Sequence, residues 1–469
     1  MDQIKAACPG PDTSATQWRN VTKAALLPLV SVRKPRLRRR DDLNGDLSRP
    51  EEKSVLSQAY EPLRILQLVG VGYEVGGAER SVKALTENLR NKGHDVLVVA
   101  SDRVVANHSA FSDRVIPAIG GRPAARFARH VWSWRAYRAL RQILRDFRPH
   151  VVHLHAPSDF SPSLFWAVRG VPTVLTVHGP EDFTLELLPW RIASSEYHGH
   201  SYRRADLTLR GRLRYWHLRA LQRPLTRAGL VHVDAVIAPS RYLAETLRHD
   251  VAPGRIRQIY NGLPLPAPAP QASTPTVLFV GRLERVKGVE WLVRSMQLVV
   301  TELASAQLVL VGRGSDEDRV REAIHERGLA AHTEICGWLT GNRLRESYER
   351  AAVVVVPSLW PEVFGQVAIE AMGTARPVVA SRVGGIPEIV ADGHTGHLVS
   401  PGDEAGLAAA ILDLLIDKAK AAAFGAAGRQ RAERLFSIAS FSACLEGVYA
   451  EVIAERLPMP RDEVPEDTV

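Results

Sequence analysis

The chain has 469 residues, more than one hydrophobic core usually serves, so we expect two domains with tails. Hydrophobic residues make up 45% of it, which is enough for both cores. Its three cysteines are widely spaced and predict neither a disulfide framework nor a zinc site. The apolar stretch at residues 24–30 is too short to span a bilayer. We therefore expect a cytoplasmic protein, either soluble or peripheral on the inner face of the plasma membrane.

The formal net charge of +9 favours an anionic partner, which could be nucleic acid, membrane or substrate. Residues 1–40 hold nine Lys and Arg against two Asp, and residues 191–230 hold nine Arg against two acidic residues. Aromatic residues near and within the second stretch are typical of helices on anionic lipid. A solvated, arginine-rich face is the alternative. Because RRM-like aromatic motifs and zinc-finger spacing are absent from the sequence, nucleic-acid binding is not expected.

Short apolar runs alternate with helix-like segments from Arg64 onward, after residues 1–60, which lack periodicity and predict a disordered leader. This rhythm is typical of βαβ units in parallel sheets buried on both faces. A Pro-rich segment, residues 264–270, separates two such series and suits a domain connector. The expected strands lie in residues 65–72, 95–100, 150–156, 172–178 and 234–240, and then in residues 276–281, 306–312, 333–336, 351–358 and 376–381.

The sequence thus predicts an α/β protein of two doubly wound, Rossmann-like domains facing across a cleft. Ligands of such sheets bind beyond the carboxyl ends of the strands, and two facing domains make the cleft the natural site. The expected division is a leader at 1–60, an N-terminal domain at 61–262 with a basic insertion at 191–230, a linker at 263–275, a C-terminal domain at 276–435, a final helix at 436–456 and a tail at 457–469.

Two glutamates follow the expected strand that ends at Ser358. Glu362 lies just before a helix that is expected to start near Phe364, and Glu370 lies within it. Unpaired N–H groups and the macrodipole at such a helix start favour an anionic ligand. Glu362 alone could be only a helix cap. Glu370 lies in an apolar helix and needs a partner, which ribose hydroxyls would supply.

Two cations lie in the loop after the strand at 276–281. Arg282 and Lys287 could hold both phosphates of a diphosphate and stabilise it as it leaves. The alternative is a loop of solvated basic residues. Earlier in the chain, Gly76 and Gly77 open the first helix and would let backbone N–H groups approach a phosphate or a sugar. A tight strand–helix turn would need the same glycines, and the full dinucleotide fingerprint is absent from the sequence.

Three histidines lie in or at the end of two adjacent expected strands. His153 and His155 are spaced to share one face, and His178 ends its strand and is the best placed to face a cleft. A third metal partner is not evident, and His153 and His155 could be structural. Asp316, Glu317 and Asp318 resemble a D-x-D metal signature but are expected to stabilise a helix start instead.

Residues 64–449 resemble retaining glycosyltransferases of family 4, which have the GT-B fold. The resemblance rests on the two glutamates eight positions apart, the G-R-L-x-x-x-K-G loop at 281–288, and matches at 76–80, 176–178, 238–240, 261–262 and 384–388. The chain departs from the family at Leu263-Pro264, where members often have a hydrophobic residue and Asp.

The resemblance implies a role for each site residue. Glu370 would bind the donor ribose, Arg282 and Lys287 the diphosphate, and Glu362 with the backbone of Phe364 and Gly365 the transferred sugar. It also implies that Gly76 and Gly77 shape the acceptor and phosphate side, and that His178 faces the donor sugar. Neither metal nor cofactor would be needed, and the leaving phosphate would help to deprotonate the acceptor.

The expected function is transfer of a hexose or N-acetylhexosamine from a nucleotide-diphosphate sugar to an alcohol acceptor, which could be a glycan, a lipid-linked saccharide or a small metabolite. UDP is the first choice of nucleotide. The expected partners are this donor, a hydroxyl acceptor and an anionic membrane surface. A sugar-nucleotide epimerase or hydrolase on a similar fold, or a non-catalytic sugar-nucleotide-binding protein, are the alternatives.

Overall fold

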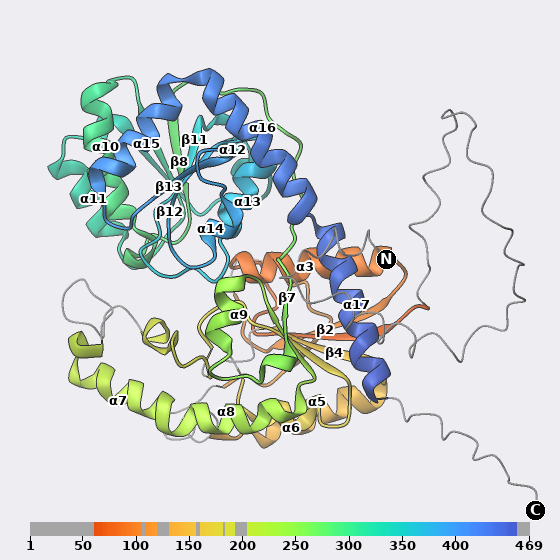
Figure 1. Ribbon diagram of the computed structural model, residues 1–469. Coiled ribbons are helices and arrows are strands. Elements are labelled where there is room, and N and C mark those ends of the chain that lie inside the picture. Colours follow the sequence, from red (N-terminus) through yellow and green to blue (C-terminus); the bar gives the residue numbers. More distant parts are fainter. Residues whose placement is uncertain are drawn as a thin grey trace, which may run out of the picture.

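A computed structural model describes residues 61–105, 109–119, 131–155, 160–181, 183–192 and 204–456. The expected leader, the expected tail and part of the basic insertion lie outside these residues. The described chain forms two α/β units that stack one on the other (Figure 1). Among the described residues, no helix is long and apolar enough to cross a membrane.

The N-terminal unit contains a seven-stranded parallel sheet in the order β3-β2-β1-β4-β5-β6-β7. Its strands are β1 Arg64–Val69, β2 Asp95–Ser101, β3 Arg114–Ile116, β4 Val151–His155, β5 Thr173–Thr176, β6 Ala235–Ala238 and β7 Ile256–Gln258. Its α-helices are α3 Gly77–Asn91, α5 Trp134–Phe147, α6 Ser163–Ala167, α7 Leu209–His217, α8 Arg223–Gly229 and α9 Arg241–Leu247.

The C-terminal unit repeats this plan with a six-stranded parallel sheet in the order β10-β9-β8-β11-β12-β13. Its strands are β8 Thr276–Val280, β9 Gln307–Val311, β10 Thr333–Gly337, β11 Val353–Val356, β12 Val378–Ser381 and β13 Gly396–Val399. Its α-helices are α10 Val289–Glu302, α11 Glu317–Glu326, α12 Gly341–Arg350, α13 Gln366–Gly373, α14 Ile386–Ile389, α15 Glu404–Ile416 and α16 Lys418–Leu435.

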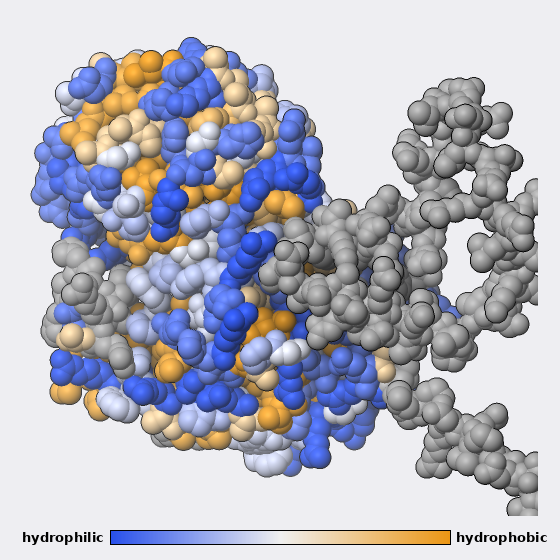
Figure 2. Space-filling model, viewed as in Figure 1, coloured by the Kyte–Doolittle hydropathy of each residue, from blue (hydrophilic) through white to orange (hydrophobic). Residues whose placement is uncertain are grey.

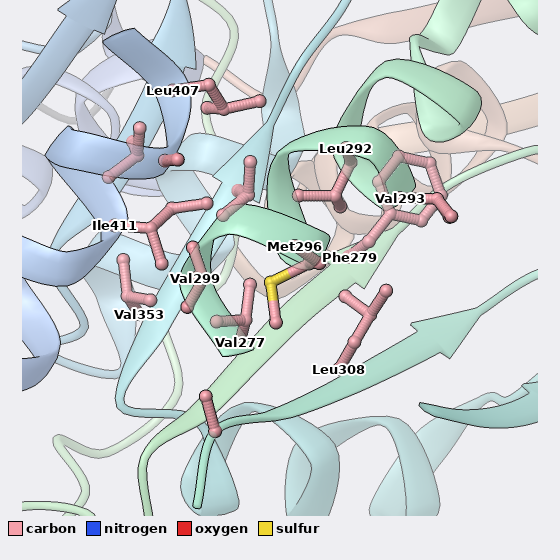
Figure 3. Packing of buried hydrophobic residues seen from close by; sticks show 14 of the residues in the cluster. Val277, Phe279, Leu292, Val293, Met296, Val299, Leu308, Val353, Leu407 and Ile411 are labelled. Carbon is pink, nitrogen blue, oxygen red and sulfur yellow. The ribbon is translucent and has the colours of Figure 1, made fainter. Parts of the chain in front are cut away.

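The apolar runs in the sequence are these strands, because both faces of each sheet are covered. Val277 and Phe279 of β8 pack under Leu292 and Met296 of α10, and Ile411 of α15 belongs to the same cluster (Figure 3). The predicted doubly wound architecture is confirmed. In both sheets the strand order reverses between the first and the fourth strand, β1/β4 and β8/β11, and ligands of such folds bind at that point.

The chain crosses between the two units twice, and the two crossings lie side by side. Leu263 and Ser437 form a parallel bridge in which the N–H of Leu263 donates to the carbonyl of Phe436 at 3.0 Å. The final helix, α17 Ile438–Arg456, then packs on the N-terminal unit against α3, as Figure 1 shows. The Pro-rich segment follows the first crossing and lies against the C-terminal unit, where Arg429 donates to the carbonyl of Pro266.

Gly262 lies at the tightest point of this crossing. A Cβ there would collide with the carbonyl oxygen of Ser437 and with Phe441. Three aromatic rings pack beside it, with centroids 5.3–5.9 Å apart: Tyr260, Phe364 and Phe436. The two crossings can therefore pair only because residue 262 has no side chain.

We predict that Gly262→Ala lowers the free energy of unfolding by about 1–3 kcal/mol, because a backbone carbonyl cannot move aside as a flexible side chain does. Urea denaturation would measure this loss. Gly254→Ala is the control, because no atom lies within 4 Å of the Cβ position of Gly254. Equal stabilities of the two variants would contradict the steric explanation.

Candidate active site

The ion pair of Lys287 and Glu362 lies at the switch point of the C-terminal sheet, in the loops that follow β8 and β11. The Nζ of Lys287 donates to Oε1 of Glu362 at 2.5 Å, and the Oγ of Ser358 donates to the same oxygen at 2.6 Å. Burial alone would raise the pKa of the Glu362 carboxyl, but the ammonium of Lys287 and these hydrogen bonds bring it below its ordinary value. Glu362 is therefore an ionised carboxylate in a fixed position.

Glycines allow the neighbouring loops to close around this pair. Gly288 and Gly384 have φ angles of 71° and 54°, which favour glycine. A Cβ on Gly288 would collide with the carbonyl of Pro357, and one on Gly384 would collide with the backbone of Glu362. The N–H of Gly385 also donates to the carbonyl of Glu362 at 2.7 Å. The 281–288 and 384–388 motifs thus hold the backbone of one loop, residues 357–365.

Glu370 lies within α13, as the sequence predicts, and it has two protein partners. The hydroxyl of Tyr348 donates to Oε2 at 2.6 Å, and Nη2 of Arg80 lies 2.9 Å from Oε1. Burial, with the Glu370 carboxylate beside it, raises the pKa of Tyr348 well above its ordinary range, so the phenol stays a proton donor. Arg80 belongs to α3, so the partner that Glu370 needs comes from the opposite domain.

The starts of α3 and α13 lie in contact. The Nε2 of Gln366, the first residue of α13, donates to Oγ of Ser81 at 2.7 Å, and a Cβ on Gly77 would collide with Oε1 of Gln366. Gly365 precedes α13 with a φ of 118°. Since the first N–H groups of a helix have no partner within it, this junction favours an anionic ligand. Gly76, Gly77 and Gly365 therefore meet at the domain boundary.

A third contact between the domains joins two of the sequence motifs. Ser240 donates through Oγ to the carbonyl of Val363 at 2.6 Å. The backbone N–H groups of Arg241 and Tyr242, at the start of α9, donate to the carboxylate of Glu388 at 2.8 and 2.9 Å. Glu388 therefore caps a helix of the opposite domain, and these bonds hold the loop that carries Glu362 against α9.

Two predicted site residues are placed differently from the rest. Arg282 is 57% exposed in its side chain and donates to Glu284 at 2.7 Å, so it does not join the Lys287–Glu362 pair in this structure. The Phe364 side chain is buried in the aromatic group beside the crossing, so only its backbone is left for a ligand.

Asp316 accepts a hydrogen bond from the N–H of Arg285 at 2.5 Å and thereby fixes the loop before Lys287.

The three histidines form a group at the ends of β4 and β5, in which His153 and His155 are buried and His178 is half-buried. His153 bonds to the hydroxyls of Tyr449 and Thr176, each at 2.7 Å, which makes it structural. The rings of His153 and His155 lie 3.9 Å apart, so they share one face as the spacing predicts. A hydrogen bond of 3.0 Å joins Nδ1 of His155 to Nε2 of His178. Burial lowers the pKa of His178 to about 4, so its imidazole is neutral at pH 7.

Sequence reasoning assigned no role to three residues that contact the site glutamates: Arg80, Tyr348 and Ser358. Arg80 has a signal in the sequence, because it lies four residues after Gly76 and therefore one helical turn into α3 on the same side. Tyr348 and Ser358 carry no such signal. Within the described part of the chain, no cluster of three or more His, Cys, Asp or Glu side chains is placed to hold a metal ion.

Two family profiles match the chain, described as "Glycosyltransferase Family 4" over residues 75–265 and "Glycosyl transferases group 1" over residues 274–417. Together with two facing parallel sheets and candidate residues at both switch points, they define a GT-B glycosyltransferase. The chain belongs to glycosyltransferase family 4, in the group 1 type.

Two curated relatives and one solved structure agree with this family assignment. Glycogen synthase of Mycobacterium tuberculosis is 29% identical over 82% of this chain and 94% of its own. Phosphatidyl-myo-inositol mannosyltransferase of Mycobacterium leprae is 30% identical over 79% and 92%. Sucrose-phosphate synthase of Thermosynechococcus elongatus is similar in structure, with a TM-score of 0.65 and 26% identity over 84% of this chain and 100% of its own.

The ion pair across the domains gives a first prediction for this site. Arg80→Met leaves the partly buried Glu370 without a cation, and we expect it to lower the free energy of unfolding by about 1–3 kcal/mol. A double-mutant cycle with Glu370→Gln should return a coupling energy of about 1 kcal/mol or more, because the two residues are in direct contact. Additive effects, within about 0.5 kcal/mol, would mean that the pair does not link the domains.

A second prediction concerns pH. Burial lowers the pKa of His153 to about 3 and that of His155 well below its ordinary value. Below about pH 6.5 the unfolded chain binds protons that the folded chain does not. The free energy of unfolding therefore decreases as the pH is lowered, by up to about 1.4 kcal/mol per pH unit for each histidine. His155→Asn should reduce this slope between pH 6.5 and 4.5 in urea titrations. Exposed His394, changed to Asn, is the control, and an unchanged slope in His155→Asn would contradict the account.

Proposed function

We propose that this glycosyltransferase moves a hexose or N-acetylhexosamine from a nucleoside-diphosphate sugar, with UDP as the first choice, to a hydroxyl acceptor with retention and without a metal ion. One observation carries the proposal: Lys287 and Glu362 lie in one loop cluster at the switch point, beside the junction of α3 and α13. Such a junction suits a diphosphate, with the sugar and ribose on either side.

Each candidate residue has a role in this proposal. Lys287 and Arg282 bind the diphosphate, and the first N–H groups of α3 and α13, at Gly77 and Gln366, add partial positive charge. Glu362, with the backbone of Phe364 and Gly365, binds hydroxyls of the transferred sugar. Arg282 is free to turn inward because it pairs with the neighbouring Glu284 at the surface, and such an exposed pair adds little stability.

Glu370 binds the ribose hydroxyls in this proposal, and its present partners support the assignment. Tyr348 donates to one carboxylate oxygen and Arg80 contacts the other. Tyr348 fixes the carboxylate while Arg80 moves aside, so that ribose hydroxyls take its place. The Arg80 guanidinium would then lie near the phosphates. Gly76 and Gly77 line that side and leave room for the acceptor, and His178 faces the donor sugar as a neutral hydrogen-bonding group.

The proposed reaction proceeds on one face of the donor sugar. The acceptor oxygen bonds to the anomeric carbon as the bond from that carbon to the diphosphate oxygen breaks. The departing oxygen takes the electron pair and then the acceptor proton, so neither a protein nucleophile nor a dedicated base is needed. Lys287 and Arg282 neutralise the growing charge on the diphosphate, which is the largest contribution the protein makes.

Similar proteins support the choice of donor and widen the choice of acceptor. Anabaena HepE, which has a TM-score of 0.60 and 18% identity, has been solved in complex with UDP-glucose. The mannosyltransferases among the relatives are named for a phosphatidyl-myo-inositol acceptor. We propose that the acceptor is a glycan, a lipid-linked saccharide or a small metabolite, and that the protein works in the cytoplasm in peripheral contact with an anionic membrane.

The test replaces the two residues with the clearest donor roles. Lys287→Met removes the cation from the leaving group and should raise the barrier by about 2–4 kcal/mol, a loss of about two to three orders of magnitude in turnover. Glu370→Gln should weaken donor binding. A panel of UDP-, GDP- and ADP-sugars, screened by thermal shift and followed by mass spectrometry of products, identifies the donor first.

Lys418→Met, an exposed lysine at the start of α16, is the matched control and should turn over as the wild type does. Circular dichroism of each variant shows whether the fold is kept. Turnover near wild type in both Lys287→Met and Glu370→Gln would overturn the proposal.

A further inference from the structure

The outward face of α7 is apolar, which is the reverse of an ordinary surface helix. The side chains of Leu209, Leu213 and Trp216 are 77%, 66% and 59% exposed. At about 100° per residue, these three positions fall within about 60° of one another around the helix. On the opposite side, Gly211 and Tyr215 are buried. A soluble helix would place its apolar stripe inward, so this stripe lacks an explanation from folding.

α7 is nevertheless a firmly attached element. Tyr215 packs in a small core with Leu188 and Leu207. The hydroxyl of Thr208 accepts from the N–H of Gly211 at 3.0 Å and caps the helix start, and Arg212 donates to the carbonyl of Leu207 at 3.2 Å. The exposed stripe is therefore held outward by the packing of its other face, along the lower edge of the molecule in Figure 1.

The stripe is bordered by arginine. Residues 209–229 contain six arginines and no acidic residue. Arg214 is exposed, and the guanidinium of Arg219 lies 5.6 Å from the centre of the Trp216 ring. Figure 2 shows apolar and hydrophilic side chains interspersed along this lower edge. Leucine and tryptophan in the centre with cations at the border match the acyl boundary and the phosphates of an anionic bilayer.

We propose that the outward face of α7, defined by Leu209, Leu213 and Trp216 with its bordering arginines, docks on an anionic lipid bilayer. A protein partner fits less well, because exposed arginines border the stripe and the cores of protein interfaces are depleted of charge. The inference deepens the membrane contact of the proposed function by naming the surface, and it does not depend on which sugar is transferred.

Contacts lead from this surface to the candidate active site. Leu188, which packs with Tyr215, begins the 3-10 turn Leu188–Arg191 that carries Trp190. The ring of Trp190 lies 6.1 Å from that of Trp360, and Trp360 lies under the ammonium of Lys287 at 5.3 Å. Docking through α7 would therefore hold Trp190, and with it this side of the domain boundary, in a fixed position relative to the lipid surface. A lipid-linked acceptor would be presented at that surface.

The test is co-sedimentation of the full chain with vesicles of phosphatidylcholine alone or with 30% phosphatidylglycerol. We expect binding only to the anionic vesicles, and less at high salt because the arginines contribute through screened charges. The triple variant Leu209→Ser, Leu213→Ser and Trp216→Ser should lose binding about tenfold or more. Ile416→Ser is the matched control, because that side chain is 68% exposed on the other domain and should leave binding unchanged.

Several results would overturn the inference. Equal binding by the triple variant would assign the contact to another segment, such as the basic residues 1–40. Absence of binding by the wild type at low salt would remove the docking surface altogether, and association of the chain with itself through this face, lost in the triple variant without lipid, would make it a protein interface. Nucleotide binding by thermal shift should be unchanged in the triple variant, so failure of the docking surface is distinguishable from failure of the proposed function.

Discussion

A buried carboxylate stays charged only if a cation and hydrogen-bond donors compensate for the lost water, and the loop of residues 357–365 is built around that constraint. Lys287 and Ser358 both donate to Glu362. On one side of the loop, Gly288 and Gly384 let neighbouring backbone approach closely. On the other side, the side chain of Val363 packs into the core of the N-terminal domain. The loop of residues 357–365 therefore belongs structurally to both domains.

The boundary between the two domains explains several of the sequence motifs together. Several of them contact the opposite domain: Ser240 reaches Val363, Glu388 caps α9, and Arg80 pairs with Glu370. Each contact joins an element near a strand end of one sheet to an element near a strand end of the other. A nucleotide placed there would touch both domains, so its binding is coupled to how closely the domains approach.

The sequence predicted the fold and the loops and helices that carry the site residues. It did not predict which side chains those residues contact. Buried strands were recognised because both faces of the sheets are covered. The strands β3, β7 and β13 were missed because they lie at sheet edges, where their side chains are only partly buried and form no apolar run. The need of Glu370 for a partner was foreseen from its apolar helix, but Arg80 and Tyr348 are distant in sequence. The basic–aromatic stretch was recognised by composition. Only the fold separates Tyr215, which is buried, from Trp216, which is exposed.

The central claim is that Lys287 and the junction of α3 and α13 bind the diphosphate beside Glu362, which binds the sugar. A crystal structure with the nucleoside diphosphate that the donor screen identifies tests this claim most directly. The account predicts a diphosphate between Lys287 and the start of α13, with ribose hydroxyls on Glu370 in place of Arg80. A nucleotide bound elsewhere, with the pairs Lys287–Glu362 and Arg80–Glu370 both unchanged, would contradict it.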